Sequence, residues 1–68
     1  MAVSIRNRIE GTVTGIIRGN VLSEVDAETL AGLVASVITT RAVDEMSLKV
    51  GDKVLLLVEA TDVNLDKP

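Results

Sequence analysis

Apolar and polar positions alternate along the first quarter of the chain. Over residues 3–17 every odd position except Asn7 holds an aliphatic residue or glycine, and the even positions stay polar until Ile16. A period of two predicts a strand with one buried face. At about 3.3 Å per residue, a straight strand of this length would span about 50 Å, more than a small domain can bury. We therefore expect the strand to bend, with Gly11 and Gly15 as corners, and its first part to pair with another chain.

Two further strands are predicted after a turn. Gly19-Asn20 is a turn dipeptide because both residues tolerate positive φ, and a strand resumes at Val21. Its predicted inward face is formed by Val21, Ser23, Val25 and Ala27, and its solvent face by Leu22, Glu24, Asp26 and Glu28. Residues 30–32 predict a hairpin loop. Residues 33–39 predict a third strand that is apolar on both faces except at one serine.

The pattern then changes to a helical one. Ala42, Val43 and Met46 have the spacing of one helix face, which predicts a short helix of about two turns. Thr40 is the candidate N-cap. The acidic pair at positions 44 and 45 would lie near the start of this helix, where the helix dipole favours negative charge.

The last predicted strand, residues 53–59, contains five consecutive aliphatic residues without alternation. A strand that is apolar on both faces is normally covered on both faces. In a single barrel one of these faces would meet water, so we expect the outer face to lie in a subunit interface. The tail that follows is polar apart from Leu65, and we expect residues 66–68 to be flexible.

Together these elements predict a mainly β fold in a single domain, residues 1–68. The order is a long bent strand, two strands, a short helix and a final strand. This order corresponds to a small five-stranded OB-like barrel with one short helix if the first strand counts twice. Assembly into an oligomer by strand sharing would cover the remaining apolar surface.

Composition supports assembly and excludes several classes of function. A domain of 68 residues buries only about 60% of the surface that its unfolded chain exposes, and small domains often depend on disulfides, metals or oligomerisation. The chain has no Cys and no His, which removes disulfides and the commonest metal ligands, so oligomerisation remains. The absence of aromatic residues and the net charge of −3 argue against nucleic-acid binding.

The same composition bears on location and on catalysis. We expect no signal peptide and no membrane span, because no apolar run approaches the roughly 20 residues that cross a bilayer. Lack of Cys is compatible with the cytoplasm. Without His or Cys the usual nucleophile–base pairs cannot form. The adjacent carboxylates, Glu24 with Asp26 and Asp44 with Glu45, are expected on solvated surfaces, so we predict no catalytic and no metal site.

The segment Ser4-Ile5-Arg6-Asn7 is the strongest candidate for chemistry. It places a hydroxyl, a guanidinium and an amide within one short extended segment. These groups, together with backbone N–H groups, can surround an anion. The alternative is ordinary solvation of an edge strand with a salt bridge from Arg6.

A family resemblance favours the anion. Residues 4–13, Ser-Ile-Arg-Asn-Arg-Ile-Glu-Gly-Thr-Val, resemble the Ser-Ala-Arg-Asn-x-Leu-x-Gly-x-Val opening of the molbindin, or Mop, family within the TOBE group. Residues 18–21 are similar to its Lys/Arg-Gly-x-Val turn. Residues 42–51 resemble its Ser-Val-Glu-Glu-Leu-Gly-Leu-Lys-x-Gly segment, and residues 60–63 its closing Ala/Ser-Ser/Thr-Asp-Val. The match covers most of residues 3–65.

The resemblance implies a cytoplasmic protein that binds molybdate or tungstate and needs no other cofactor. It also implies a ring of six subunits, a trimer of dimers, with anions at the subunit interfaces. One site would combine the first segment of one subunit with the segment near the last strand of another. The implied oxyanion-binding residues are Ser4, Ile5, Arg6, Asn7, Ala60 and Thr61, with a second site near Gly19, Asn20 and Val21.

Glu59 departs from the family pattern, which usually has Lys at this position. At 4–6 Å and an effective dielectric near 20, each pair of unit charges is worth about 3–4 kcal/mol, so a carboxylate there would oppose a dianion. Either Glu59 faces solvent, or the site is altered. The alternative function is therefore a Mop-like oligomeric scaffold with lost or altered anion binding. A detached accessory domain of a transporter or regulator is a third possibility.

Overall fold

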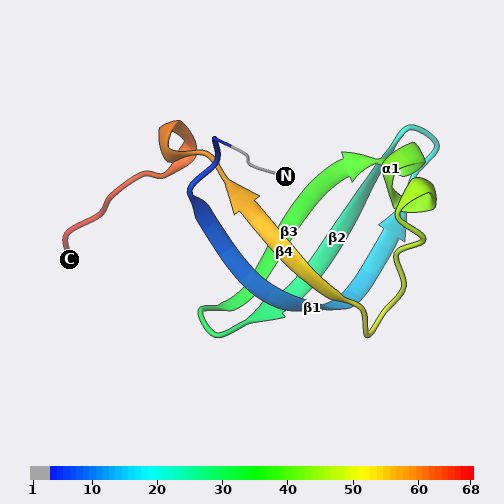
Figure 1. The fold of residues 1–68 in the computed structure, drawn as a ribbon, viewed down its shortest axis with the longest axis horizontal. Coiled ribbons are helices and arrows are strands. Elements are labelled where there is room, and N and C mark those ends of the chain that lie inside the picture. Colours follow the sequence, from blue (N-terminus) through cyan, green and yellow to red (C-terminus); the bar gives the residue numbers. More distant parts are fainter. Residues whose placement is uncertain (1–3) are drawn as a thin grey trace.

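The computed structural model describes residues 4–68, which form an antiparallel sheet with one short α-helix and one 3₁₀ turn (Figure 1). Four strands have the spatial order β3-β2-β1-β4. The elements are β1 Asn7–Arg18, β2 Leu22–Thr29, β3 Gly32–Thr39, α1 Thr40–Glu45, β4 Lys53–Val58 and η1 Ala60–Asp62. The mainly β prediction is confirmed. The sheet has four strands rather than five, and Val3, where the first strand was predicted to begin, lies outside the described residues.

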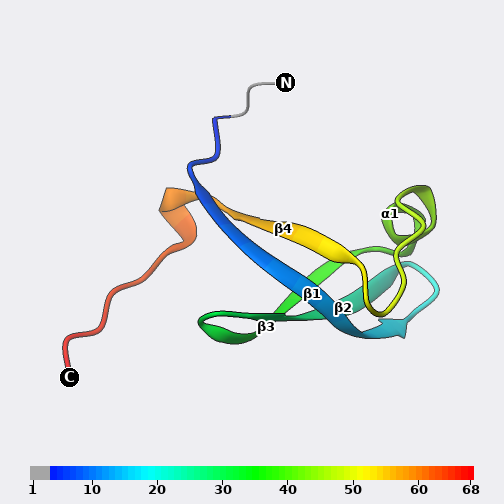
Figure 2. The ribbon, with the colours of Figure 1, turned by 60° about the horizontal axis from the view of Figure 1, so that its bottom comes forward.

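The long strand β1 is shared between two partners. Residues 7–12 pair with β4, and residues 11–18 pair with β2, both antiparallel. The register with β2 shifts between Val13 and Gly15, which is the mark of a β-bulge that bends a strand. Figures 1 and 2 show the resulting curve of β1. The five-stranded prediction counts the first strand twice, whereas the structure has one continuous strand β1. This explains the difference in strand number.

Of the two predicted corners, Gly15 borders the irregular register, whereas Gly11 is regularly paired with both neighbours. Gly11 has a different role. A Cβ atom there would lie 3.1 Å from the Glu28 carbonyl oxygen and 3.1 Å from Leu56 Cδ1. Glycine therefore allows β2 and β4 to approach β1 closely where the two pairings overlap.

The core lies between the two arms of the folded sheet. It is built on Val13, Val25 and Val43, with Ile16, Ile38, Leu48 and Val54 packed around them. The alternation predicted for β2 is confirmed from Ser23 onward, because Ser23, Val25 and Ala27 are buried. Val21 is the exception. It lies before the first residue of β2 and is 72% exposed.

Helix α1 has six residues, in keeping with the predicted length of about two turns, and its N-cap is Thr39 rather than Thr40. The Thr39 hydroxyl accepts a hydrogen bond from the Ala42 N–H at 3.1 Å. Asp44 and Glu45 consequently fall in the last turn, and the first turn has no acidic residue. Asp44 instead pairs with Arg18 at 2.9 Å. Both side chains are more than half exposed, so this pair contributes little stability.

Thr40 ties the turn before β2 to the helix. Its backbone N–H donates to the Val21 carbonyl at 2.8 Å, and its hydroxyl donates to the Gly19 carbonyl at 2.8 Å. The buried Ser23 hydroxyl lies 2.7 Å from the Thr40 hydroxyl. Since the Thr40 hydrogen is already donated to Gly19, Ser23 is the donor in this pair. A buried polar pair of this kind is stable only while both groups are satisfied.

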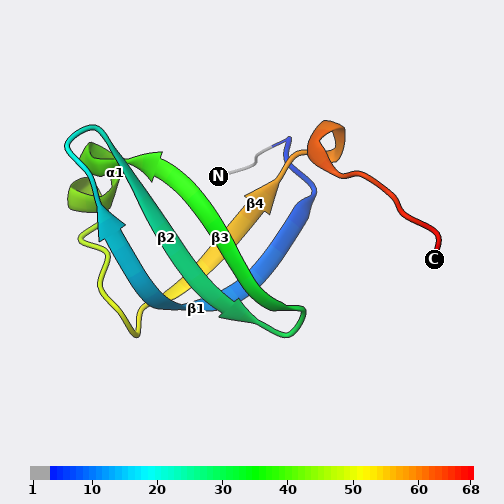
Figure 3. The ribbon, with the colours of Figure 1, turned by 180° about the vertical axis from the view of Figure 1, so that it is seen from behind.

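Strands β3 and β4 form the two edges of the sheet, and their outer faces are apolar. Leu55 and Leu57 on β4 are 55% and 45% exposed, and Leu33 and Val37 on β3 are more exposed still. This agrees with the prediction of a last strand that is apolar on both faces, although β4 ends at Val58 and not at residue 59. An apolar groove of about 290 Å³ is lined by residues of both strands, whose ribbons are seen from behind in Figure 3.

The chain leaves the sheet at the end where β1 begins. After η1, residues 64–68 are exposed and extend away from the body (Figure 2). Within residues 4–68, neither helical segment has the length and apolar character needed to cross a membrane.

Replacing Thr40 by Val removes its hydroxyl while preserving its shape. We expect the free energy of unfolding to fall by about 1–3 kcal/mol, because the Gly19 carbonyl and the Ser23 hydroxyl lose a buried partner. Urea unfolding followed by circular dichroism measures this, since the chain has no Trp or Tyr. Thr14→Val is the matched control, because the exposed Thr14 hydroxyl makes only a 3.4 Å contact. Equal losses in both variants would contradict the assigned role of Thr40.

Candidate functional site

A small pocket lies where the chain enters β1 and leaves β4. Its volume is about 210 Å³. It is lined by Ser4, Ile5, Arg6, Glu59, Ala60 and Thr61. The pocket follows from the antiparallel register, in which Asn7 pairs with Val58 at the end of the ladder. The three residues before Asn7 and the three after Val58 therefore leave the sheet side by side.

The local structure after β4 directs the second segment toward the first. Glu59 is extended, with φ −69° and ψ 144°, and precedes the 3₁₀ turn η1. The Asp62 N–H donates to the Glu59 carbonyl at 2.9 Å and closes that turn. Figures 1 and 2 show η1 beside the segment that leads into β1. The turn therefore places Ala60 and Thr61 opposite residues 4–6.

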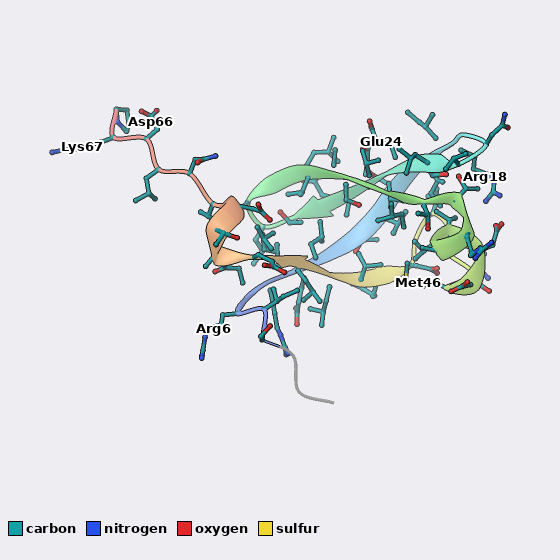
Figure 4. All side chains as sticks on the ribbon, turned by 90° about the horizontal axis from the view of Figure 1, so that it is seen from above. Arg6, Arg18, Glu24, Met46, Asp66 and Lys67 are labelled. Carbon is teal, nitrogen blue, oxygen red and sulfur yellow. The ribbon has the colours of Figure 1, made fainter. Side chains whose placement is uncertain are left out.

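The pocket offers hydrogen-bond donors for an anion. Ser4 and Thr61 supply hydroxyl groups, and Arg6 supplies a guanidinium with five N–H donors. All three residues are exposed, and Ile5 between them is half-buried. In Figure 4 the Arg6 side chain extends outward from the segment before β1. Ala60 adds no side-chain donor.

The structure brings together five of the six residues predicted for the first site. Asn7 does not line the pocket, because it belongs to the sheet and pairs with Val58. The pairing of β1 with β4 brings residues 4–6 and 59–61 of the same chain together, because its ladder ends where Asn7 pairs with Val58, 51 positions further along the sequence.

Glu59 lines the pocket. The sequence alone allows Glu59 to face solvent away from the site, and Glu59 is not among the predicted binding residues. Its side chain is exposed, yet it belongs to the same recess as Arg6. The pocket therefore holds one cation and one carboxylate. The signal for this was present in the sequence as the unusual acidic residue next to Ala60.

The second predicted group lies elsewhere. Gly19, Asn20 and Val21 form the turn between β1 and β2, next to α1 and at the other end of the molecule from Arg6 (Figure 4, where Arg18 marks this end). A Cβ atom on Gly19 would collide with the Leu22 carbonyl oxygen, so the turn requires glycine. The Gly19 and Val21 carbonyls already accept hydrogen bonds from Thr40. Carbonyl oxygens only accept hydrogen bonds, so an anion here would have to be held by N–H or hydroxyl donors.

The carboxylates Glu24 and Asp26 lie on the outer face of β2. A hydrogen bond between them, then the charge of Asp26 and a small effect of burial, raise the pKa of Glu24 above its ordinary value. Asp26 lies opposite Gly15 in the sheet. Among residues 4–68 there is no cluster of three acidic residues that could hold a metal ion. Neither Glu24 nor Asp26 lines the pocket formed by residues 4–6 and 59–61.

Comparison with known proteins identifies relatives along nearly the whole chain. The model of the TOBE domain matches residues 3–65. Molybdenum-pterin-binding protein 2 of Clostridium pasteurianum is 36% identical over 64 residues, which cover 93% of this chain and 94% of that protein.

Two solved structures share the fold. A molybdate-binding protein from Sporomusa ovata superposes with a TM-score of 0.95 at 34% identity, over 98% of this chain and all of that one. The cytoplasmic molybdate-binding protein ModG, solved with molybdate bound, superposes with a TM-score of 0.82 at 34% identity, over 88% of this chain and 43% of that one. The chain therefore belongs to the TOBE domain family and, within it, to the Mop group that the molybdenum-pterin-binding proteins represent.

Proposed function

We propose that this protein reversibly binds a tetrahedral oxyanion, molybdate or tungstate, and serves to store or buffer it inside the cell. The observation that carries the proposal is the pocket formed by residues 4–6 and 59–61. The relatives described as molybdate-binding support the choice of ligand. They favour anion binding over the scaffold alternative, for which no contact in the structure provides a separate reason.

The chemistry of the pocket suits such a ligand. A tetrahedral dianion presents only hydrogen-bond acceptors, so its site must present donors. The hydroxyls of Ser4 and Thr61, the backbone N–H groups near Ile5 and the Arg6 guanidinium are the donors available. Hydrogen bonds between charged partners are the stronger class. Sulfate has the same charge and shape but is smaller, so the size of a preorganised site would select against it.

We further propose that the protein acts as a homo-oligomer, with six subunits arranged as a trimer of dimers and the anions held at subunit interfaces. The exposed apolar faces of β3 and β4, and the groove between them, support assembly. These two edge strands have unpaired backbone groups that another chain can use. In an assembled ring, a neighbouring subunit would complete the pocket, and Gly19, Asn20 and Val21 would form the second site.

We also propose where the protein acts and that it is a binding protein. We place the protein in the cytoplasm, where the related ModG acts. We propose binding rather than catalysis, because the chain has no His and no Cys to act as nucleophile or base. Neither a nucleic acid nor a membrane is a proposed partner.

Molybdate and tungstate are expected to bind and stabilise the native protein, and sulfate to do so much more weakly. At a concentration 100 times its Kd, a ligand that binds only the folded state adds about 2.7 kcal/mol to its stability. Calorimetric titration and thermal unfolding followed by circular dichroism measure the two effects. If neither molybdate nor tungstate gives heat or a thermal shift, the proposed function is wrong.

Arg6→Ala removes the cation from the pocket. We expect molybdate affinity to fall about 10- to 100-fold, which corresponds to a lost charge-assisted hydrogen bond of about 1.5–3 kcal/mol. Arg8→Ala is the matched control, since Arg8 is an exposed arginine two residues further on that does not line the pocket. Calorimetry on both variants checks this. Equal losses of molybdate affinity in the two variants would mean that the anion binds outside the proposed pocket.

Leu57→Glu places a charge on the outer face of β4. Because this face is proposed to be buried between subunits, we expect the variant to form a smaller species than the native protein does at the same concentration. Native mass spectrometry reads the subunit number directly. Leu65→Glu, which changes a 96% exposed residue of the tail, should leave the assembly intact. If Leu57→Glu has the same subunit number as the native protein, the outer face of β4 does not lie in the interface.

A further inference from the structure

The pocket contains two charged side chains of opposite sign. Arg6 comes from the segment before β1, and Glu59 from the residue after β4. The other four lining residues are neutral. The next ionisable residues along the chain are Arg8 on β1 and Asp62 in the 3₁₀ turn, and neither lines the pocket. The charge that an anion meets there is therefore set mainly by Arg6 and Glu59.

A carboxylate that lines the same pocket as a bound dianion is in specific conflict with it. A carboxylate and a molybdate ion both present oxygen acceptors and no hydrogen. Two acceptors of like charge cannot form a hydrogen bond, and their repulsion grows as water leaves the pocket. Arg6 alone cannot satisfy both partners, because its single positive charge faces three negative charges. One proton placed between a Glu59 oxygen and an anion oxygen resolves the conflict and converts repulsion into a hydrogen bond.

We propose that oxyanion binding in this pocket is coupled to the uptake of one proton, held between the Glu59 carboxyl group and the bound anion. The inference rests on the proposed function and adds to it a regulation of the same site. The proton comes from solvent and forms an O–H bond with a Glu59 carboxylate oxygen, while the anion itself is held by hydrogen bonds and charge without a covalent bond to the protein. Binding then adds one negative charge to the protein instead of two. Glu59 is a binding residue that makes affinity respond to pH.

The coupling has a measurable sign. A reaction that takes up one proton loses affinity as pH rises, by an amount approaching tenfold per pH unit. The slope is to be measured over a pH interval in which free molybdate does not titrate, so that the ligand alone supplies no such slope. We expect the native protein to show this fall. We also expect calorimetry in two buffers of different ionisation enthalpy to count about one proton taken up per anion in this pocket.

Glu59→Gln is the decisive variant. Its amide can donate a hydrogen bond to the anion without a bound proton, so the pH dependence and the proton uptake should disappear. Affinity at about pH 8 should rise at least tenfold. The side chain of Glu59 is exposed and makes no capping hydrogen bond with η1, so the fold is expected to survive. Glu28→Gln, which changes an exposed carboxylate on β2, is the control and should keep the native slope.

An infrared difference spectrum provides an independent readout. Addition of molybdate to the native protein should produce the carbonyl band of a protonated carboxylic acid, and the band should be absent in Glu59→Gln. The inference is overturned if the native protein binds molybdate without proton uptake, or if the variant keeps the native slope. In both cases anion binding itself would stand. If neither the native protein nor the variant binds molybdate at any pH tested, the proposed function fails and the inference fails with it.

Discussion

The pairing of one strand with two partners is the constraint on which the rest of this structure depends. The first half of β1 forms its ladder with β4 and the second half with β2, and the two ladders overlap at Gly11 and Thr12. A Cβ atom at Gly11 would lie only 3.1 Å from groups on both neighbours, so glycine favours this close approach. The bulge between Val13 and Gly15 then turns the strand so that its two halves enclose the core. The pocket at the start of β1 exists because the first of these ladders ends there.

A second consequence of this arrangement is that the sheet remains open. Strands β3 and β4 are its edges and do not pair with each other. The core is correspondingly small, with Val13, Val25, Ala27 and Val43 as its buried apolar residues among those described. A domain of this size without disulfides has few other sources of stability. The same edge strands that limit the stability of one chain are the surfaces through which several chains can associate.

The pocket combines features that act in opposite directions on an anion. Arg6 and two hydroxyl groups attract it, and Glu59 repels it unless a proton is present. The end of the molecule near α1 differs from the pocket in its charged groups. There the charged pair Arg18–Asp44 is already neutralised within the chain, and Thr40 has used the two carbonyl groups of the adjoining turn. The two ends of β1 are therefore chemically different, and the first offers the hydroxyl and guanidinium donors of Ser4, Thr61 and Arg6.

Sequence alone determined the strands, the turn at Gly19-Asn20, the presence of one short helix and the apolar character of the last strand. These properties are local, because side-chain alternation and turn chemistry depend on near neighbours along the chain. The cap of α1 was missed by one residue, since adjacent threonines offer the same hydroxyl and only the backbone angles distinguish them. The tertiary structure decided which strands pair and which residues face each other. It gave β1 two partners, buried Thr40 against Ser23, and placed Glu59 in the pocket with Arg6. These contacts join residues far apart in the sequence, and no local pattern encodes the register that brings them together.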